Sequence, residues 1–143
     1  MAKFTTTQSF ANSEQITSGK LNAIVSGLAA DADVARAAQI AARASFANSG
    51  QLCISMERIY VHESRHDSFV QHFLATVATF KMGDPSAPDT YIGAIARAPQ
   101  LAVLEAQVAD AVAKGATLLT GGKRRPGPGN WFEPTVLTNV NHT

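Results

Sequence analysis

The residues best suited to carry out chemistry form a short run, Asn48-Ser49-Gly50-Gln51-Leu52-Cys53, which ends in the one cysteine of the chain. Gly50 lets the backbone turn tightly and pass close to a ligand, because glycine has no Cβ. We expect Cys53 to follow this turn at or near a helix start, where free N–H groups and the helix dipole raise the thiolate fraction. The same N–H groups would hold the oxyanion that forms when a thiolate attacks a carbonyl. The run thus predicts a nucleophilic thiol, although a lone cysteine in an alanine-rich domain is more often a small buried apolar residue.

Metal binding is not expected from the histidines. His62 ends a predicted strand, while His66 and His72 are six residues apart and do not share a helix face. Besides His142, the chain offers one cysteine and no clustered carboxylates. We therefore expect no metal site.

Composition narrows the partners and the location. Twelve Lys and Arg residues against 11 Asp and Glu give a formal net charge of +1, without the basic stripe of a nucleic-acid-binding protein. No apolar run approaches the roughly 20 residues that span a bilayer, and residues 1–18 lack the apolar stretch of a secretory signal. We expect no nucleic-acid or membrane partner and a cytoplasmic location. An apolar fraction of 45% with only 16% charged residues indicates that apolar surface faces a partner, and we expect a homo-oligomer.

Hydrophobic spacing predicts alternating strands and helices after a flexible polar arm at residues 1–18. Strands are predicted at 22–25, 58–62, 116–119 (buried) and within 131–140. One helix is predicted to begin at Asp31 with Asp33 in its first turn, and another at Ser64 with Asp67 in a capping box. A third covers 101–114. This alternation predicts an α/β domain at residues 19–143, with a layered sheet of three to four largely parallel strands and flanking helices.

Six segments in order along the chain resemble landmarks of the aldehyde dehydrogenase family. The first surrounds the cysteine, where residues 46–63 read FANSGQLCISMERIYVHE. The others are Gly19–Val25 with 30–33, Phe80–Pro85, Ile92-Gly93 with Gln100, Gly115–Lys123 and Phe132–Leu137. The resemblance covers about residues 19 to 143 and is to part of the family's catalytic domain. Within the family, the wording around Cys53 is most similar to succinate-semialdehyde dehydrogenases.

The resemblance implies an oxidoreductase that converts an aldehyde to a carboxylate with NAD or NADP. Cys53 would be the nucleophile that forms a thiohemiacetal and then a thioester, and its own N–H would contribute to the oxyanion hole. Gln100 matches a glutamine that lies near the cofactor ribose in relatives. The expected substrate is succinate semialdehyde or a similar small aldehyde.

Departures from the family pattern keep other interpretations open. Ile16 stands where the family has its general-base glutamate, and Ala94 replaces a proline. The family's dinucleotide-binding domain has no counterpart in the sequence, so we expect the isolated chain to have little or no dehydrogenase activity. One alternative is a non-catalytic binding or assembly module that retains the fold. Another is a residual thiol esterase that uses Cys53 without a nicotinamide cofactor.

Overall fold

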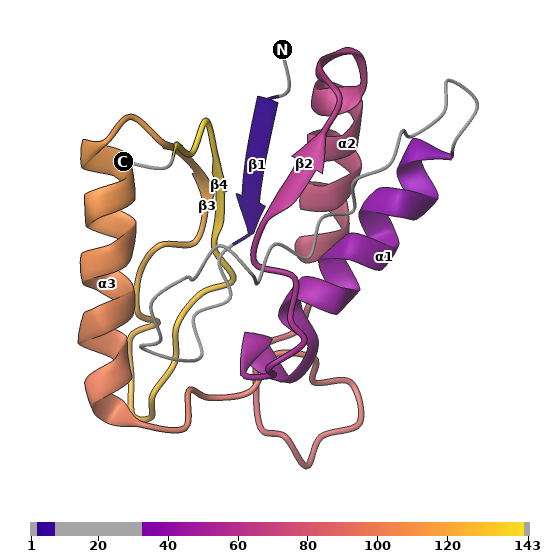
Figure 1. The fold of residues 1–143 in the computed structure, drawn as a ribbon. Helices are drawn as coiled ribbons and strands as arrows, with labels where there is room; N and C mark the ends of the chain where they lie inside the picture. The colour runs from indigo at the N-terminus through magenta and orange to yellow at the C-terminus, as the bar shows by residue number, and fades with distance from the viewer. Residues whose placement is uncertain (1–2, 8–32, 142–143) are drawn as a thin grey trace.

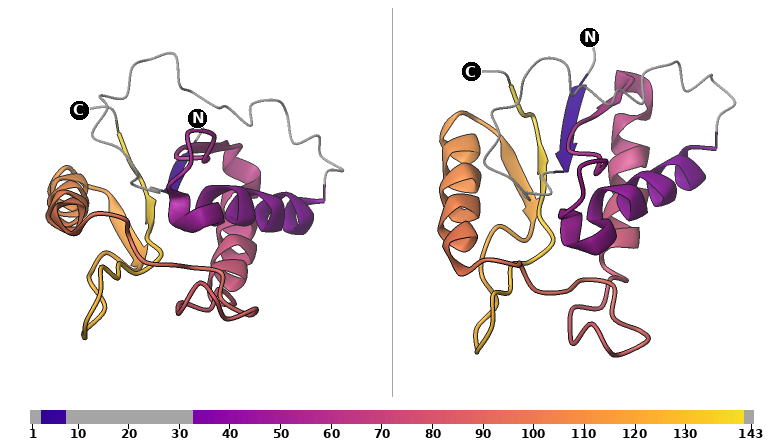
Figure 2. Two further views of the ribbon diagram at one scale, coloured as in Figure 1. Left: turned by 90° about the horizontal axis from the view of Figure 1, so that it is seen from below. Right: turned by 60° about the horizontal axis from the view of Figure 1, so that its bottom comes forward.

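The computed structural model of the chain describes residues 3–7 and 33–141, which form helices on both faces of a small sheet (Figure 1). Helix α3 lies on one face, and α1 and α2 lie together on the other (Figure 2). Within the described ranges the elements are β1 (Lys3–Thr7), α1 (Val34–Phe46), the 3-10 turn η1 (Ala47–Gly50), β2 (Ile59–Val61), α2 (Glu63–Val77), α3 (Ala98–Ala113), β3 (Thr117–Thr120) and β4 (Val136–Thr138). The strand predicted at 22–25 lies outside the described residues.

Within residues 3–7 and 33–141 the sheet has four strands in the order β2-β1-β4-β3, and every pairing between them is antiparallel. The sequence-based expectation of three to four strands is met, but the expectation of a largely parallel sheet is wrong for these strands. β2 and β4 do run in the same direction, since both are antiparallel to β1. However, β1 lies between them, and β3 and β4 are joined by a loop without a helix, which allows antiparallel pairing.

Strand β1 is formed by residues that the sequence assigns to a flexible polar arm. Its backbone pairs Lys3 with Val61 on one side and Thr7 with Val136 on the other. The arm was predicted because residues 1–18 show no hydrophobic periodicity. A strand enclosed by two others is stabilised by backbone hydrogen bonds on both sides. The hydrophobic periodicity of its sequence does not predict these bonds.

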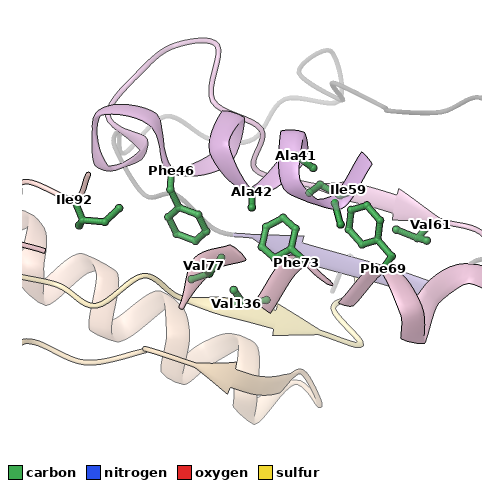
Figure 3. Close-up of a cluster of buried hydrophobic side chains, with 11 residues drawn as sticks. Ala41, Ala42, Phe46, Ile59, Val61, Phe69, Phe73, Val77, Ile92 and Val136 are labelled. Atoms are coloured by element: carbon green, nitrogen blue, oxygen red, sulfur yellow. The ribbon is translucent and has the colours of Figure 1, made fainter. Parts of the chain in front are cut away.

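The main core lies between the sheet and the α1–α2 pair. Phe73 of α2 is 0% exposed, and its ring centroid lies 6.4 Å from that of Phe46 and 5.9 Å from that of Phe69 (Figure 3). Alanines at 38, 41 and 42 form the α1 face of this core, so the two helices approach closely. On the opposite face of the sheet a smaller cluster contains Ile95, Leu101, Leu104, Val108 and Phe132. Helical spacing in the sequence predicts apolar stripes through Ala38 and Ala41, through Phe69, Phe73 and Val77, and through Leu101, Leu104 and Val108, and all of these residues are buried. Val112, predicted to continue the last stripe, is 45% exposed.

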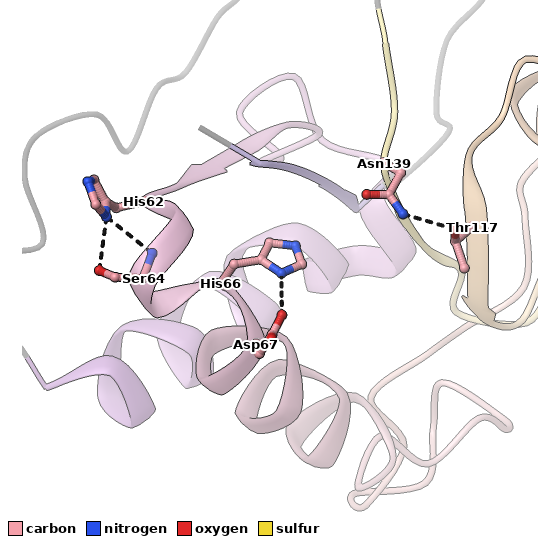
Figure 4. Close-up of polar contacts among 6 residues, drawn as sticks. All are labelled: His62, Ser64, His66, Asp67, Thr117 and Asn139. Carbon is pink, nitrogen blue, oxygen red and sulfur yellow. Dashed lines mark hydrogen bonds and ion pairs between the residues drawn. The ribbon is translucent and has the colours of Figure 1, made fainter. Parts of the chain in front are cut away.

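The N-caps of the two helices of the main core each lie two residues from their predicted positions. Asp33 is the N-cap of α1, and its Oδ1 accepts a hydrogen bond of 2.9 Å from Arg36 N. Helix α2 begins at Glu63, with the His62 ring accepting from Ser64 N at 3.3 Å (Figure 4). A histidine thus takes the capping role expected of Ser64, since its Nδ1 is also a hydrogen-bond acceptor. Asp31 lies outside the described residues.

Strand β3 differs from expectation in its burial. All four of its residues are exposed, including Leu118 at 40% and Leu119 at 37%, whereas the paired strand β4 is buried throughout. Position in the sheet does not explain this difference, because β2 is also an end strand and its Ile59 and Val61 are buried. The difference lies in packing, since Ile59 and Val61 of β2 and Val136 of β4 belong to the main core, whereas no residue of β3 belongs to either described core cluster.

Candidate active site around Cys53

The chain reverses sharply between the end of α1 and Cys53. Asn48, Ser49 and Gly50 have φ values of 51°, 56° and 73°, so three successive residues adopt left-handed conformations. Glycine takes this conformation at little cost, as predicted for Gly50, but each non-glycine residue there costs roughly 1–2 kcal/mol. Two strained residues persist only where surrounding contacts hold them.

Those contacts come from the side chains of Ser49 and Gln51, which bind the backbone of residues 93–96. Ser49 Oγ accepts from Gly93 N at 2.8 Å and lies 3.1 Å from Gly93 O. Gln51 Oε1 accepts from Ala96 N at 2.8 Å, and its Nε2 donates to Ala94 O at 3.2 Å. We call these four contacts the 49/51 clamp. The clamp joins the turn before Cys53 to a segment more than forty residues away.

Cys53 is exposed and lies within a turn that Ser55 N closes by donating to Leu52 O at 3.2 Å. The expectation of a helix start at Cys53 is wrong, because α1 and η1 both precede the cysteine and the next element is strand β2. In the described part of the chain, the N–H of Cys53 has no hydrogen-bond partner. The turn therefore supplies a free N–H beside the thiol, but without the dipole of a helix.

Gln100 lies in the first turn of α3, directly after the segment held by the clamp. Arg97 is the N-cap of this helix, and Gln100 N donates to Arg97 O at 3.0 Å. The side chain is half-buried, and its Nε2 is a buried donor without a hydrogen-bond partner. Gln100 thus has an unsatisfied amide donor and is connected to the Cys53 turn through residues 93–96.

The histidines are dispersed over helix α2 and its start. Nδ1 of His66 lies 2.9 Å from Asp67 Oδ1, and His62 contacts Ser64, as Figure 4 shows. Among the residues that the structure describes, no group of three or more His, Cys, Asp or Glu side chains is placed to hold a metal ion. His142 and Ile16 lie outside these residues. A search of the described helices finds none with the length and apolar character of a membrane span.

Sequence reasoning identified Cys53 and Gln100 but did not identify the clamp. Ser49 and Gln51 were read only as parts of a turn, because their partners are backbone atoms 44 and 45 residues away. Ile92-Gly93 was noted as a separate landmark, and nothing in either segment shows that the two are in contact. A local signal does exist in Gln51, since a long amide side chain two residues before Cys53 can bond both to backbone N–H donors and to backbone carbonyl acceptors.

The site and the fold together define an α/β domain that presents an exposed thiol on a braced turn, an arrangement suited to covalent attack on a carbonyl. The aldehyde dehydrogenase family model matches residues 7–143, and the chain belongs to that family.

Relatives and solved structures agree with this assignment. The 3,6-anhydro-alpha-L-galactose dehydrogenase of Vibrio sp. (strain EJY3) is 44% identical over 114 residues, which are 77% of this chain and 24% of that protein. A probable succinate-semialdehyde dehydrogenase (NADP(+)) of Sinorhizobium fredii is 41% identical over 113 residues, 79% of this chain and 23% of that protein. The crystal structure of succinate-semialdehyde dehydrogenase from Burkholderia pseudomallei superposes with a TM-score of 0.74 at 37% identity, covering 80% of this chain and 24% of that one. The chain spans about a quarter of the length of these relatives.

Proposed function

We propose that Cys53 is the nucleophile of an NAD(P)-dependent oxidation of an aldehyde to a carboxylate. The observation that carries the proposal is the exposed thiol beside its own unpartnered N–H, on a turn braced by the 49/51 clamp. Membership of the aldehyde dehydrogenase family supports the reaction class.

The chemistry begins when the Cys53 thiolate adds to the aldehyde carbon, and the carbonyl π electrons move to oxygen. The N–H of Cys53 stabilises this oxyanion by donating a hydrogen bond to it. NAD or NADP, held in part by Gln100, would supply the acceptor for the hydride that leaves the former carbonyl carbon. The acyl group is then a thioester on Cys53, and water cleaves the C–S bond to give the carboxylic acid and the thiol. Because Ile16 stands at the position of the family's glutamate, this last step would lack its usual base and be slow.

Gln100 is the residue of this chain that we assign to the cofactor, either NAD or NADP. Its buried Nε2 lacks an acceptor, and a ribose hydroxyl is a suitable one. The amide must turn outward to make that bond, because the nitrogen is not exposed. An unsatisfied donor favours such a movement, since the amide gives up no existing bond.

The substrate we propose is succinate semialdehyde or a similarly small aldehyde, in line with the names of the relatives. The test measures NADH or NADPH formation from that aldehyde by the purified chain, with Cys53→Ala as control. We expect little turnover from the chain alone, because it spans only about a quarter of its relatives' length. Whatever turnover is found must vanish in Cys53→Ala, and turnover that survives the substitution would refute the assignment of Cys53.

A thiol esterase is the second candidate, and the same free N–H favours it, because acyl transfer to Cys53 needs no hydride acceptor. Incubation with p-nitrophenyl acetate should release p-nitrophenol and leave about one acetyl group on each chain, because Cys53 is a single nucleophile. Mass spectrometry should detect this group as a mass gain of about 42 Da. Cys53→Ala should show neither signal. Acetylation elsewhere with Cys53 unmodified would exclude this activity.

We also propose that the chain self-associates as a homo-oligomer. Strand β3 is at the end of the described sheet and exposes Leu118 and Leu119. Its sequence Thr-Leu-Leu-Thr reads the same in both directions, so two copies paired antiparallel would place like residues opposite each other. Light scattering after size exclusion should give a mass above 15.1 kDa. A monomer at all concentrations tested would contradict the proposal.

A further inference from the structure

The strained turn before Cys53 needs an external support, because Asn48 and Ser49 both occupy left-handed conformations. Within the turn, Gln51 N donates to Asn48 O at 3.0 Å, and Asn48 Nδ2 donates to Gln51 O at 3.3 Å. Further support comes from the side chains of Ser49 and Gln51, which contact residues 93–96. The position of the thiol therefore depends on contacts that lie far from it in the sequence.

We propose that Ser49 and Gln51 are positioning residues that fix the Cys53 turn through hydrogen bonds to the backbone of residues 93–96. The inference rests on the proposed role of Cys53 and adds the means by which its thiol and N–H are held in place. Neither side chain contacts the reacting atoms in this proposal. Both act through the backbone that leads into the Cys53 turn.

The chemistry of the clamp is specific to its residue types. Gln51 uses both halves of its amide, accepting from Ala96 N through Oε1 and donating to Ala94 O through Nε2. A carboxylate has no donor for the second bond, and an alkyl group has neither. Ser49 uses a hydroxyl in the same double fashion at Gly93, which it contacts through both the N–H and the carbonyl. Each side chain thus satisfies a donor and an acceptor of the same short segment.

The clamp also links the Cys53 turn to the start of helix α3. Residues 93–96 lead directly to Arg97, the N-cap of α3, and to Gln100 in its first turn. Holding this segment against the Cys53 turn fixes the nucleophile relative to the start of α3. If the clamp were lost, Cys53 could move relative to Gln100, while the core between α1 and α2 would remain packed.

The experiment uses the single cysteine as its reporter. A trifluoromethyl label is attached to Cys53, and its ¹⁹F line width measures the mobility of the turn. Ser49→Ala and Gln51→Ala should each narrow the line, and exchange of the Ala96 amide hydrogen should become roughly fivefold faster in Gln51→Ala, as expected for one lost hydrogen bond. Gln71→Ala is the matched control, because Gln71 is an exposed glutamine on α2 and its removal should change neither signal.

A second variant makes the test independent of how well the alanine variants fold. In Gln51→Glu, the protonated carboxyl can still accept from Ala96 N and donate to Ala94 O, but the ionised form places a negative oxygen against that carbonyl. The label should be immobile at low pH and become mobile as the pH rises through the pKa range of the introduced carboxyl, ordinarily about 4.3. Gln71→Glu should give a line width that does not change over the same range.

The outcomes separate this inference from the function on which it rests. Line narrowing in both alanine variants and a pH transition in Gln51→Glu support positioning, even when the chain turns over no aldehyde. An unchanged line width in Gln51→Ala, or a flat profile in Gln51→Glu, overturns the inference even when Cys53 proves to be the nucleophile. Circular dichroism of the helices must remain that of the wild type, so that global unfolding is not read as loss of the clamp.

Discussion

At the scale of single residues, hydrogen bonds to Asp84 show how one side chain can shape a loop. Its carboxylate accepts from Ser86 N at 2.9 Å and from Ser86 Oγ at 2.7 Å. These bonds, first the backbone one and then the hydroxyl one, hold the pKa of Asp84 below its ordinary value, because they stabilise the charged form. These bonds shape the turn at Asp84 in the loop that follows helix α2.

Ser86→Ala should raise the pKa of Asp84 part of the way toward its ordinary value, since the backbone donor remains. A folded-state pKa below the unfolded one stabilises the fold above the unfolded pKa, and that contribution disappears as the pH falls through the folded pKa. The variant should therefore lose less stability than the wild type on acidification below about pH 4. Carboxyl ¹³C NMR titration of Asp84 measures the shift. A pKa equal to that of the wild type would show that the hydroxyl plays no part.

The sequence predicted Cys53 as a candidate nucleophile but did not predict the 49/51 clamp. The Gly-Gln-X-Cys run is a weak signal by itself, and the prediction rested on the longer resemblance to the aldehyde dehydrogenase family. The helix start expected at Cys53 did not occur, because Asn48 and Ser49 join Gly50 in left-handed conformations and reverse the chain. Such conformations in asparagine and serine depend on tertiary contacts, which sequence spacing does not encode.

At the scale of elements, the N-cap of α1 can be tested directly. Asp33→Ala removes the acceptor of the bond from Arg36 N and should lower the free energy of unfolding by about 1 kcal/mol. Asp33→Asn should lose little, because asparagine caps helices about as well as aspartate. Urea unfolding followed by circular dichroism measures both. Equal losses in the two variants would mean that the charge, and not the cap, is what matters.

Substitutions in the aromatic core between α1 and α2 should lower the free energy of unfolding much more than loss of the Asp33 N-cap does. Phe73→Ala removes a ring that is 0% exposed and packed against Phe46 and Phe69, at a cost of about 3–5 kcal/mol. That is a large part of the stability of a small domain, so the variant should be largely unfolded near 37 °C. Phe73→Leu should have a thermal midpoint between those of the wild type and Phe73→Ala. A thermal midpoint for Phe73→Ala close to that of the wild type would show that this core contributes little.

The helices were easier to predict than the strands. The helical stripe at Phe69, Phe73 and Val77 could be read from spacing alone, because one helix face meets one core. Leu118 and Leu119 were predicted to be buried, but they are exposed, and no residue of β3 belongs to either described core cluster. Which strands meet a core is set by long-range packing, so the apolar content of β3 alone did not predict its burial.

At the scale of the whole molecule, β1 is the element that makes one sheet out of two halves. Thr5 pairs with Ile59 of β2 on one side and with Thr138 of β4 on the other. Thr5→Pro removes a backbone N–H from the ladder and should cost about 1–3 kcal/mol for the carbonyl left unpaired. Thr5→Val keeps the N–H and serves as the control.

Amide hydrogen exchange in β2 and β4 distinguishes the possible results for Thr5→Pro. Faster exchange in both strands is the expected result, because each would lose its ladder with β1. Faster exchange in only one strand would mean that the other half of the sheet is stable without β1. The antiparallel arrangement itself could not be predicted from the alternation of elements, because it depends on a strand located in the polar arm.

The position of β1 also has a consequence for the order in which the molecule is assembled. The ribosome completes Lys3–Thr7 long before Val136–Thr138, yet these strands are hydrogen-bonded neighbours. The helix pair α1–α2 can close on a partial chain, whereas the sheet must wait for Val136–Thr138 and for a slow, long-range encounter. Pulse-labelling during refolding should therefore protect the amides of α2 before those of β1. Until that closure, a nascent chain would expose the apolar side of its helix pair and would be a natural client for a chaperone.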